Sequence, residues 1–250
     1  MTKETNTYSA SGEVGSLRQR RTRWERIWID LKKAPPTAIF GIIVILAYAF
    51  VSIFAPILAP FGEADSQFSA YQTFSDKHIL GTDQIGRDIL SRLIYGARNT
   101  IGIALVTTII SFFIGMTLGL IAAINRSYLD QVISRGVDVL MAIPSLIFAL
   151  MLLSIFGSST FSLICIIAVL DSTRVFRLTR AVSMNVVVMD YVEAATLRGE
   201  KLGWIMRKEI LPNILPPLVA EFGLRFCFVF LAIAALSFLG VGIQPVSYTH

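Results

Sequence analysis

The sequence has 250 residues, of which 54% are hydrophobic and 16% are charged, and its mean hydropathy is +0.68. This composition excludes an ordinary soluble domain, and apolar runs long enough to cross about 30 Å of hydrocarbon predict an all-α polytopic membrane protein. The net charge of +5 comes from Lys and Arg beside those runs, as the positive-inside rule requires, so we expect no nucleic-acid partner.

The chain begins with a polar, basic stretch, residues 1–37, which we expect to lie in the cytoplasm. Four of its apolar residues recur at helical spacing: Trp24, Ile27, Trp28 and Leu31. They predict a short amphipathic helix at the membrane surface. The apolar run that follows is too long for a cleaved signal peptide, so we predict the first transmembrane span at residues 38–60, leading outward.

A polar external segment is predicted at residues 61–99, between the first two spans. The second span returns inward at about residues 100–124. It carries Gly115 and Gly119, a small-xxx-small step that permits close helix packing.

Three further spans are predicted toward the C-terminus. The third runs over about residues 136–156 and contains Pro144, and the fourth over about residues 160–173. The fourth run is short, so we expect its inner end to be buried by protein. An excess of Lys and Arg marks residues 174–212 as cytoplasmic, and the fifth span follows at about residues 214–241. The count is five spans, with the N-terminus inside and the C-terminus outside.

The most informative part of the cytoplasmic segment is residues 190–212, whose sequence indicates a helix, a break, a second helix and a stop. Ala194 and Ala195 allow another surface to approach the backbone closely. Gly199 frees the backbone to turn, and Pro212 is expected to end the second helix. Two short helices of this kind form a docking element, although an ordinary amphipathic surface loop could have the same residues.

The same segment resembles the EAA motif of binding-protein-dependent ABC importer permeases, in which EAA, three residues, Gly and nine residues lead to I-x-L-P. The residues that we assign to the docking loop on this resemblance are Glu193, Ala194, Ala195, Leu197, Gly199, Ile210, Leu211 and Pro212. Glu209 departs from the pattern, because it stands where the motif has Ile. The resemblance implies that this loop binds an ATP-binding subunit.

A second stretch, LGTDQIGRDILSRLIYGAR at residues 80–98, is similar to a segment of dipeptide, oligopeptide and nickel permeases, in the C-type partner of each heteromeric pair. The residues assigned to it are Gly81, Thr82, Asp83, Gly86, Arg87, Asp88, Arg92, Gly96 and Arg98. The charges between positions 83 and 92 stand at helical spacing and can pair at i,i+4, so we favour a structural role. Contact with an external solute-binding protein is the alternative.

Four charged residues lie in or beside the predicted spans. Glu221 and Arg225 are four residues apart on one predicted helix, so we expect a mutual ion pair. Lining of the translocation pathway is the alternative, because intramembrane charges usually face a cavity or a partner. Asp138 and Asp171 are expected to reach the membrane interface.

The sequence contains no GxxxxGK[ST] phosphate-binding loop and no nucleophile, base or metal-ligand constellation. We therefore predict no catalytic residues, no cofactor and no metal, and we expect ATP hydrolysis in a separate subunit. The resemblance implies the type I transmembrane domain of an ABC importer, with residues 100–245 as its core, in the inner or plasma membrane. Its implied partners are a second permease subunit, ATP-binding subunits, an external solute-binding protein and the lipid bilayer.

The fold implied by the resemblance has a sixth span, whereas five are predicted here. We therefore expect a truncated or misassembled end, with residues 246–250 as a non-native tail. The predicted cargo is di- or oligopeptides, with nickel or another small solute such as glutathione as the alternative. An ion-coupled secondary transporter and a membrane-embedded assembly factor are the alternatives from other classes.

Overall fold

The computed structural model describes residues 35–63, 65, 68–75, 77–125 and 128–241. The amphipathic helix predicted in the leader and the tail at 246–250 lie outside these residues. The regular secondary structure of the described part is helical, with one isolated bridge between Thr82 and Asp88. The chain divides into two compact units, residues 1–47 and residues 48–250.

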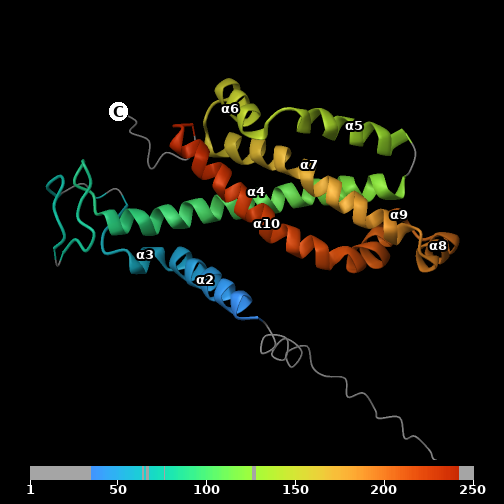
Figure 1. Ribbon diagram of the computed structural model, residues 1–250, viewed down its shortest axis with the longest axis horizontal. Coiled ribbons are helices and arrows are strands. Elements are labelled where there is room, and N and C mark those ends of the chain that lie inside the picture. The colour runs from blue at the N-terminus through green and yellow to red at the C-terminus, as the bar shows by residue number, and fades with distance from the viewer. Residues whose placement is uncertain (1–34, 64, 66–67, 76, 126–127, 242–250) are drawn as a thin grey trace, which may run out of the picture. The chain divides into compact units, whose positions relative to one another are not determined.

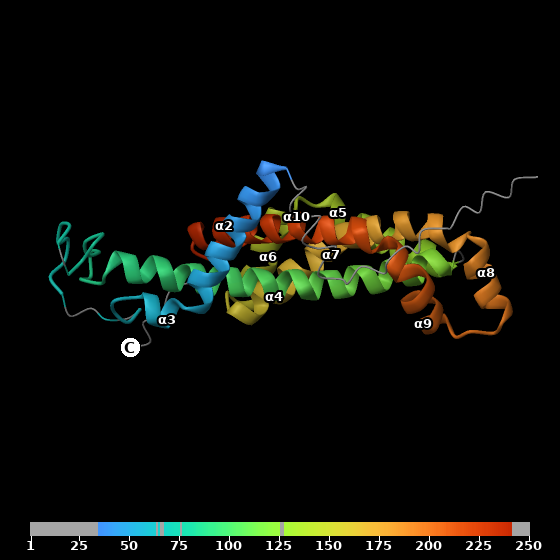
Figure 2. The ribbon, with the colours of Figure 1, turned by 90° about the horizontal axis from the view of Figure 1, so that it is seen from below.

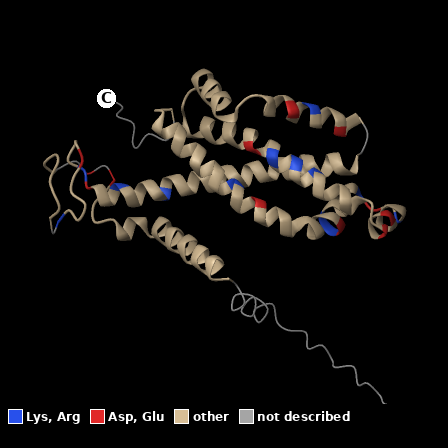
Figure 3. Ribbon diagram, in the orientation of Figure 1, with Lys and Arg blue, Asp and Glu red and all other residues tan. Residues whose placement is uncertain are grey.

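The predicted first span is occupied by α2 (Pro36–Ile53) and α3 (Ala55–Leu58). Figure 3 shows that α2 carries no charged residue, and none of its side chains is fully buried. Such a helix is suited to apolar surroundings. The break at Phe54 comes just before Pro56, which lies in the first turn of α3, where its missing N–H costs nothing.

The second predicted span begins earlier than expected. α4 (Ile89–Ile124) has 36 residues, so it includes the part of the external segment from Ile89 to Asn99. At about 1.5 Å per residue it is roughly 54 Å long, well beyond the roughly 30 Å of a hydrocarbon core. Asp88 starts the helix as its N-cap, and its carboxylate accepts a hydrogen bond from the Ser91 N–H.

The third predicted span is sharply bent. Residues 128–156 form two helices, α5 (Tyr128–Ala142) and α6 (Ser145–Phe156), which meet at 89°. Pro144 lies at the break, because proline has no N–H to donate and disfavours helical geometry at the preceding Ile143.

Protein buries the inner end of the fourth predicted span, as expected, since Asp171, Ser172 and Thr173 are buried. α7 (Thr160–Val187) continues well past Thr173, so its last turns use residues that were assigned to the cytoplasmic loop. Two of their charged residues, Arg177 and Arg180, are paired with α5. Arg180 binds Asp130 with Nε–Oδ1 and Nη2–Oδ2 distances of 2.5 and 2.6 Å, and Arg177 binds Asp138 at 3.2 Å. These two ion pairs hold the charged part of α7 against α5.

Close packing of α4 against α7 confirms the prediction made for Gly115 and Gly119. A methyl group on Gly115 would lie 2.5 Å from the Ser172 carbonyl oxygen, and one on Gly119 would lie 2.8 Å from Thr179 Cβ. The two backbones therefore approach one another where glycine leaves room. Figures 1 and 2 show α4, α7 and α10 (Leu211–Phe238) running alongside one another in the larger unit.

Replacing Gly115 with alanine is expected to destabilise the protein by about 1–3 kcal/mol, because the new methyl group has no space against α7. The matched control is Gly102→Ala in the same helix, where the added methyl meets nothing within 4 Å. That change should be neutral or stabilising by up to roughly 1 kcal/mol, since alanine favours helix. Thermal midpoints of the detergent-solubilised protein measure both. Equal midpoints for the two variants would contradict the packing argument.

The second cytoplasmic helix does not stop at Pro212, contrary to the prediction. α9 (Leu202–Ile205) passes into a π-helical turn, η1 (Met206–Ile210), and then directly into α10. Within this turn the Leu211 N–H donates to the Met206 carbonyl, one residue further back than in an α-helix. The Asn213 side-chain amide donates to the Glu209 carbonyl at 2.6 Å. A wide turn therefore carries the chain past Pro212 without ending the helix.

Among the described residues, three helical stretches are long and apolar enough to cross a membrane: Pro36–Ile53, Ile89–Ile124 and Leu202–Phe238. The bent α5–α6 pair makes a fourth if it counts as one span. α7 is not in this set, since Asp171, Arg174 and Arg177 all lie within its first 18 residues.

Candidate functional site

The predicted docking loop is a short helix, α8 (Asp190–Leu197), attached to the bundle by one face. Val192 and Ala195 are buried in an apolar cluster with Leu120 of α4 and with Ile205 and Ile210. α8 therefore rests on the ends of the long helices, and its opposite face is free.

Gly199 closes α8 as the sequence predicted, in a recognisable cap. Its φ is +77°, its N–H donates to the Thr196 carbonyl at 2.9 Å, and the Glu200 N–H donates to the Ala195 carbonyl at 3.3 Å. This pair of bonds is the Schellman motif, which needs a left-handed residue at the position of Gly199. The chain consequently reverses sharply and enters α9.

The structure divides the eight assigned docking residues between two faces. Ala195 and Ile210 are buried, and Leu211 is half-buried. The exposed ones are Glu193, Ala194, Leu197, Gly199 and Pro212. Leu197 is 82% exposed, and Leu202 and Trp204 of α9 add partly exposed apolar surface nearby in the chain, a contribution that sequence reasoning missed. An exposed leucine and tryptophan beside charged residues are typical of a surface that binds another protein.

The 80–98 segment folds differently from the helical pairing that its spacing suggested. Residues 81–88 form turns, in which Gly81 and Gly86 have φ of +78° and +79°. The Asp83 carboxylate accepts hydrogen bonds from the Arg87 and Ile85 N–H groups, both at 2.9 Å. It also pairs with Arg87 at 3.1 Å and with Arg92 at 2.6 Å. Asp83 is thus the centre of this network, and only its pair with Arg87 has the expected i,i+4 spacing.

Asp88 bonds to His78 and Ser91 rather than to Arg92. Its Oδ1 lies 3.0 Å from His78 Nδ1, and its Oδ2 accepts from Ser91 Oγ at 2.9 Å. All three of these residues are buried, and the His78 ring packs against Phe61 and Phe68. Sequence reasoning missed His78, because its partner is ten residues away. The remaining assigned residues of this segment lie beside the network (Thr82) or on α4 (Gly96 and Arg98).

This segment is expected to lose stability in acid. Burial raises the pKa of Asp83, but hydrogen bonds from Arg87 and Ile85 outweigh it, so the pKa falls below its ordinary value. The pKa of Asp88 is lowered in the same way, with burial opposed by bonds from Ser91 and His78. The stabilisation from these two carboxylates is therefore complete above about pH 3.9, the ordinary pKa of an aspartate. It is lost as the pH falls through their lowered pKa values.

Melting temperatures measured from about pH 7 to about pH 3 test this expectation. Asp83→Asn and Asp88→Asn should lower the melting temperature at neutral pH and flatten its fall in acid. Asp65→Asn is the control, because Asp65 is exposed and, among the described residues, its carboxylate bonds only to the nearby Gly62 N–H. Profiles parallel to wild type for both test variants would contradict the assigned role.

A second charged cluster lies inside the bundle. Arg225 of α10 pairs with Glu221, at 2.7 Å from Nε to Oε1, as the sequence predicted, and also with Asp171 of α7, at 3.5 Å from Nη1 to Oδ1. Ser111 Oγ of α4 donates to Asp171 Oδ2 at 3.3 Å. Asp171 is buried, so it does not reach the interface that was expected for it.

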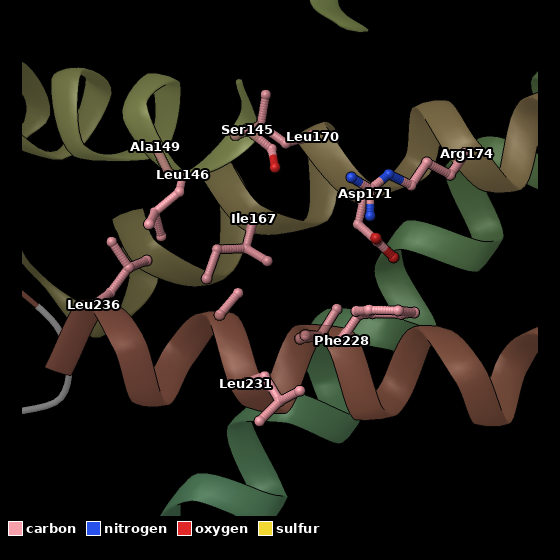
Figure 4. Close-up of a pocket in the computed structure, with 12 residues that line it drawn as sticks. Ser145, Leu146, Ala149, Ile167, Leu170, Asp171, Arg174, Phe228, Leu231 and Leu236 are labelled. Atoms are coloured by element: carbon pink, nitrogen blue, oxygen red, sulfur yellow. The ribbon is translucent and has the colours of Figure 1, made fainter. Parts of the chain in front are cut away.

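A cavity of about 360 Å³ lies beside this cluster, between α6, α7 and α10. Figure 4 shows Asp171 and Arg174 at one end and Leu146 and Leu236 toward the other. Neither Glu221 nor Arg225 lines the cavity. Asp171 is the residue of this charged cluster that lines the cavity. An aspartate within an apolar run was the sequence feature that could have indicated this site.

Comparison with known proteins identifies the family of this chain. Residues 115–248 match the binding-protein-dependent transport system inner membrane component, and residues 22–76 match the N-terminal TM domain of oligopeptide transport permease C. The chain is 35% identical to the dipeptide transport system permease protein DppC of Haemophilus influenzae, over 90% of this chain and 78% of that protein. The Escherichia coli K12 protein of the same name is 37% identical, over 83% of this chain and 72% of that protein.

A third relative is the glutathione transport system permease protein GsiD of Pectobacterium atrosepticum. It is 31% identical, over 90% of this chain and 75% of that protein. A matched family of this kind works with an ATPase and with a solute-binding protein and is not itself catalytic. The chain belongs to the binding-protein-dependent transport system inner membrane components, and it is a multi-pass permease subunit of an ABC importer.

Proposed function

We propose that this permease carries di- or oligopeptides and is driven by an ATP-binding subunit that docks on the exposed face of α8. The observation that carries the docking proposal is the division of α8 into two faces. Val192 and Ala195 fix the helix to the bundle, whereas Glu193, Ala194 and Leu197 are exposed. A helix held in this way presents a fixed surface to a partner and transmits that partner's movement to the helices beneath it.

The coupling route follows from the continuity of the chain beyond Gly199. α9, η1 and α10 form one helical stretch from Leu202 to Phe238, so a displacement at Trp204 is carried into the bundle. ATP binding would draw the docked subunits together, move α8 and α9, and tilt α10 against α4 and α7. In this way the nucleotide state of the partner would alternate access to the permease interior.

The proposed topology places the N-terminus in the cytoplasm and counts five spans, with α7 included as a protein-buried span in a type I transmembrane domain. α7 can take this place because Arg177 and Arg180 are paired with α5 and Asp171 with α10. The 80–98 segment then lies outside, where it can meet the solute-binding protein. A second permease subunit completes the pathway in this proposal.

Peptides are proposed as cargo because relatives at about 35% identity are named dipeptide permeases. Glutathione is the second candidate, since one relative at 31% identity is named a glutathione permease.

The proposal is tested by deleting this subunit and measuring uptake of radiolabelled Ala-Phe, glutathione and Ni²⁺ in whole cells. Loss of Ala-Phe uptake alone, restored by the cloned subunit, is the expected result. Loss of only glutathione or Ni²⁺ uptake would replace the peptide assignment. Uptake that persists without the ATP-binding subunits would contradict the docking proposal.

A further inference from the structure

The charged end of the cavity between α6, α7 and α10 holds an exposed arginine, Arg174. Arg174 follows Asp171 by three residues on α7, so the two side chains lie on one face of the helix, and both line the cavity. In the part of the chain that the structure describes, Arg174 attracts Asp171 electrostatically but makes no hydrogen bond or ion pair. The next arginine of α7, Arg177, is paired with Asp138.

Asp171 does not satisfy Arg174, because both of its oxygens face other groups. Oδ1 lies 3.5 Å from Arg225 Nη1, and Oδ2 accepts a hydrogen bond from Ser111. The charge of Asp171 is therefore shared with Arg225. A guanidinium has five N–H donors in a planar fork that matches a carboxylate, so the unmet chemistry at this end of the cavity is that of a carboxylate ligand.

The rest of the cavity wall is apolar. Its lining away from the charged end includes Leu146 and Ala149 of α6, Ile167 of α7, and Leu231 and Leu236 of α10. The volume of about 360 Å³ is in the range of small-molecule sites, roughly 300–1,000 Å³. The cavity has an arginine and an aspartate at one end and an apolar wall elsewhere, and Asp171 already contacts Arg225, so a ligand with a carboxylate for Arg174 and an apolar substituent suits it.

We propose that this cavity binds the C-terminal residue of the transported peptide, with its carboxylate on Arg174 and its side chain against the apolar wall. This inference rests on the proposed peptide transport function and names a contact within it. The site therefore distinguishes a free C-terminal carboxylate from the corresponding amide.

The test uses the complete importer reconstituted in lipid nanodiscs without the solute-binding protein, so that this protein's own selectivity is absent. Binding of radiolabelled Ala-Phe is competed with unlabelled Ala-Phe and with its C-terminal amide. We expect the free acid to compete at least about tenfold better in wild type, because a hydrogen-bonded charge pair is lost with the amide. Arg174→Gln should abolish this difference, and Arg174→Lys should retain part of it.

Arg135→Gln is the matched control, because Arg135 is an exposed arginine on α5 that does not line the cavity. It should keep the wild-type preference. Leu231→Trp fills the apolar end and should weaken binding of acid and amide alike, which tests the cavity even if the Arg174 variants fail to assemble.

A preference for the acid that survives Arg174→Gln, or binding unaffected by Leu231→Trp, would overturn the inference. Failure of the importer to take up any peptide in cells would instead count against the proposed function.

Discussion

Replacing Leu197 with aspartate is expected to release the ATP-binding subunit while leaving the permease folded. Leu197 is 82% exposed, so the change removes little from the fold of this chain. It puts a charge at the centre of the proposed contact, where an apolar anchor is worth about 2 kcal/mol or more. Affinity should therefore fall by about thirtyfold or more. Co-purification of the ATP-binding subunits with the tagged permease measures the effect.

Ile79→Asp is the control for this substitution, because Ile79 is 61% exposed and lies before α4, at the other end of the bundle. It should retain the ATP-binding subunits at the wild-type level. Glu193→Lys tests the same face with a change of charge, and it too should insert normally and lose the partner. If Leu197→Asp binds as well as wild type, α8 is not the coupling surface.

Replacing Arg225 with methionine should have the largest effect on stability. Arg225 lies between two carboxylates, Glu221 and Asp171, and its own side chain is buried. Removing it takes away the ion-pair partner that Glu221 and Asp171 share, and breaking a buried pair costs about 3–5 kcal/mol. The expected result is loss of the monodisperse protein peak in size-exclusion chromatography of the solubilised importer.

The triple variant Glu221→Gln, Asp171→Asn, Arg225→Met separates charge from packing. It has no buried charge at this place and should recover most of the stability that Arg225→Met loses, because neutral side chains of similar size cost far less to bury. A triple variant as unstable as the single one would show that Arg225 acts through its packing, for example over the Phe228 ring, where its guanidinium lies 4.9 Å from the ring centroid.

Features set by neighbours in sequence were predicted correctly. Gly115 and Gly119 were identified as a close-packing step, and the Glu221–Arg225 ion pair follows from their spacing on one helix. The turn at Gly199 was predicted because glycine adopts a positive φ without a steric cost. In each case the sequence signal spans about one helical turn, although the surface packed against Gly115 and Gly119 belongs to α7.

Features that depend on distant residues were missed or wrong. Asp171 meets Arg225 across 54 positions in sequence, so no local spacing could indicate that contact. Pro144 and Pro212 look alike in sequence, yet one breaks the helix and the other does not. The difference arises because a π-helical turn and the Asn213 side chain accommodate Pro212, whereas the chain at Pro144 bends to 89°.

The π-helical turn between α9 and α10 also fixes a rotational phase. An α-helix turns by about 100° per residue, and a π-helical turn contains one residue more than the α-helical turn it replaces. Deleting one residue from Met206–Ile210 would therefore restore regular α-helix and leave Trp204 close to its present direction about the axis of α10, whereas a deletion in the regular helix between Leu211 and Arg225 would rotate it by about 100°. The wide turn thus accommodates one extra residue without changing the direction in which the exposed surface of α9 points.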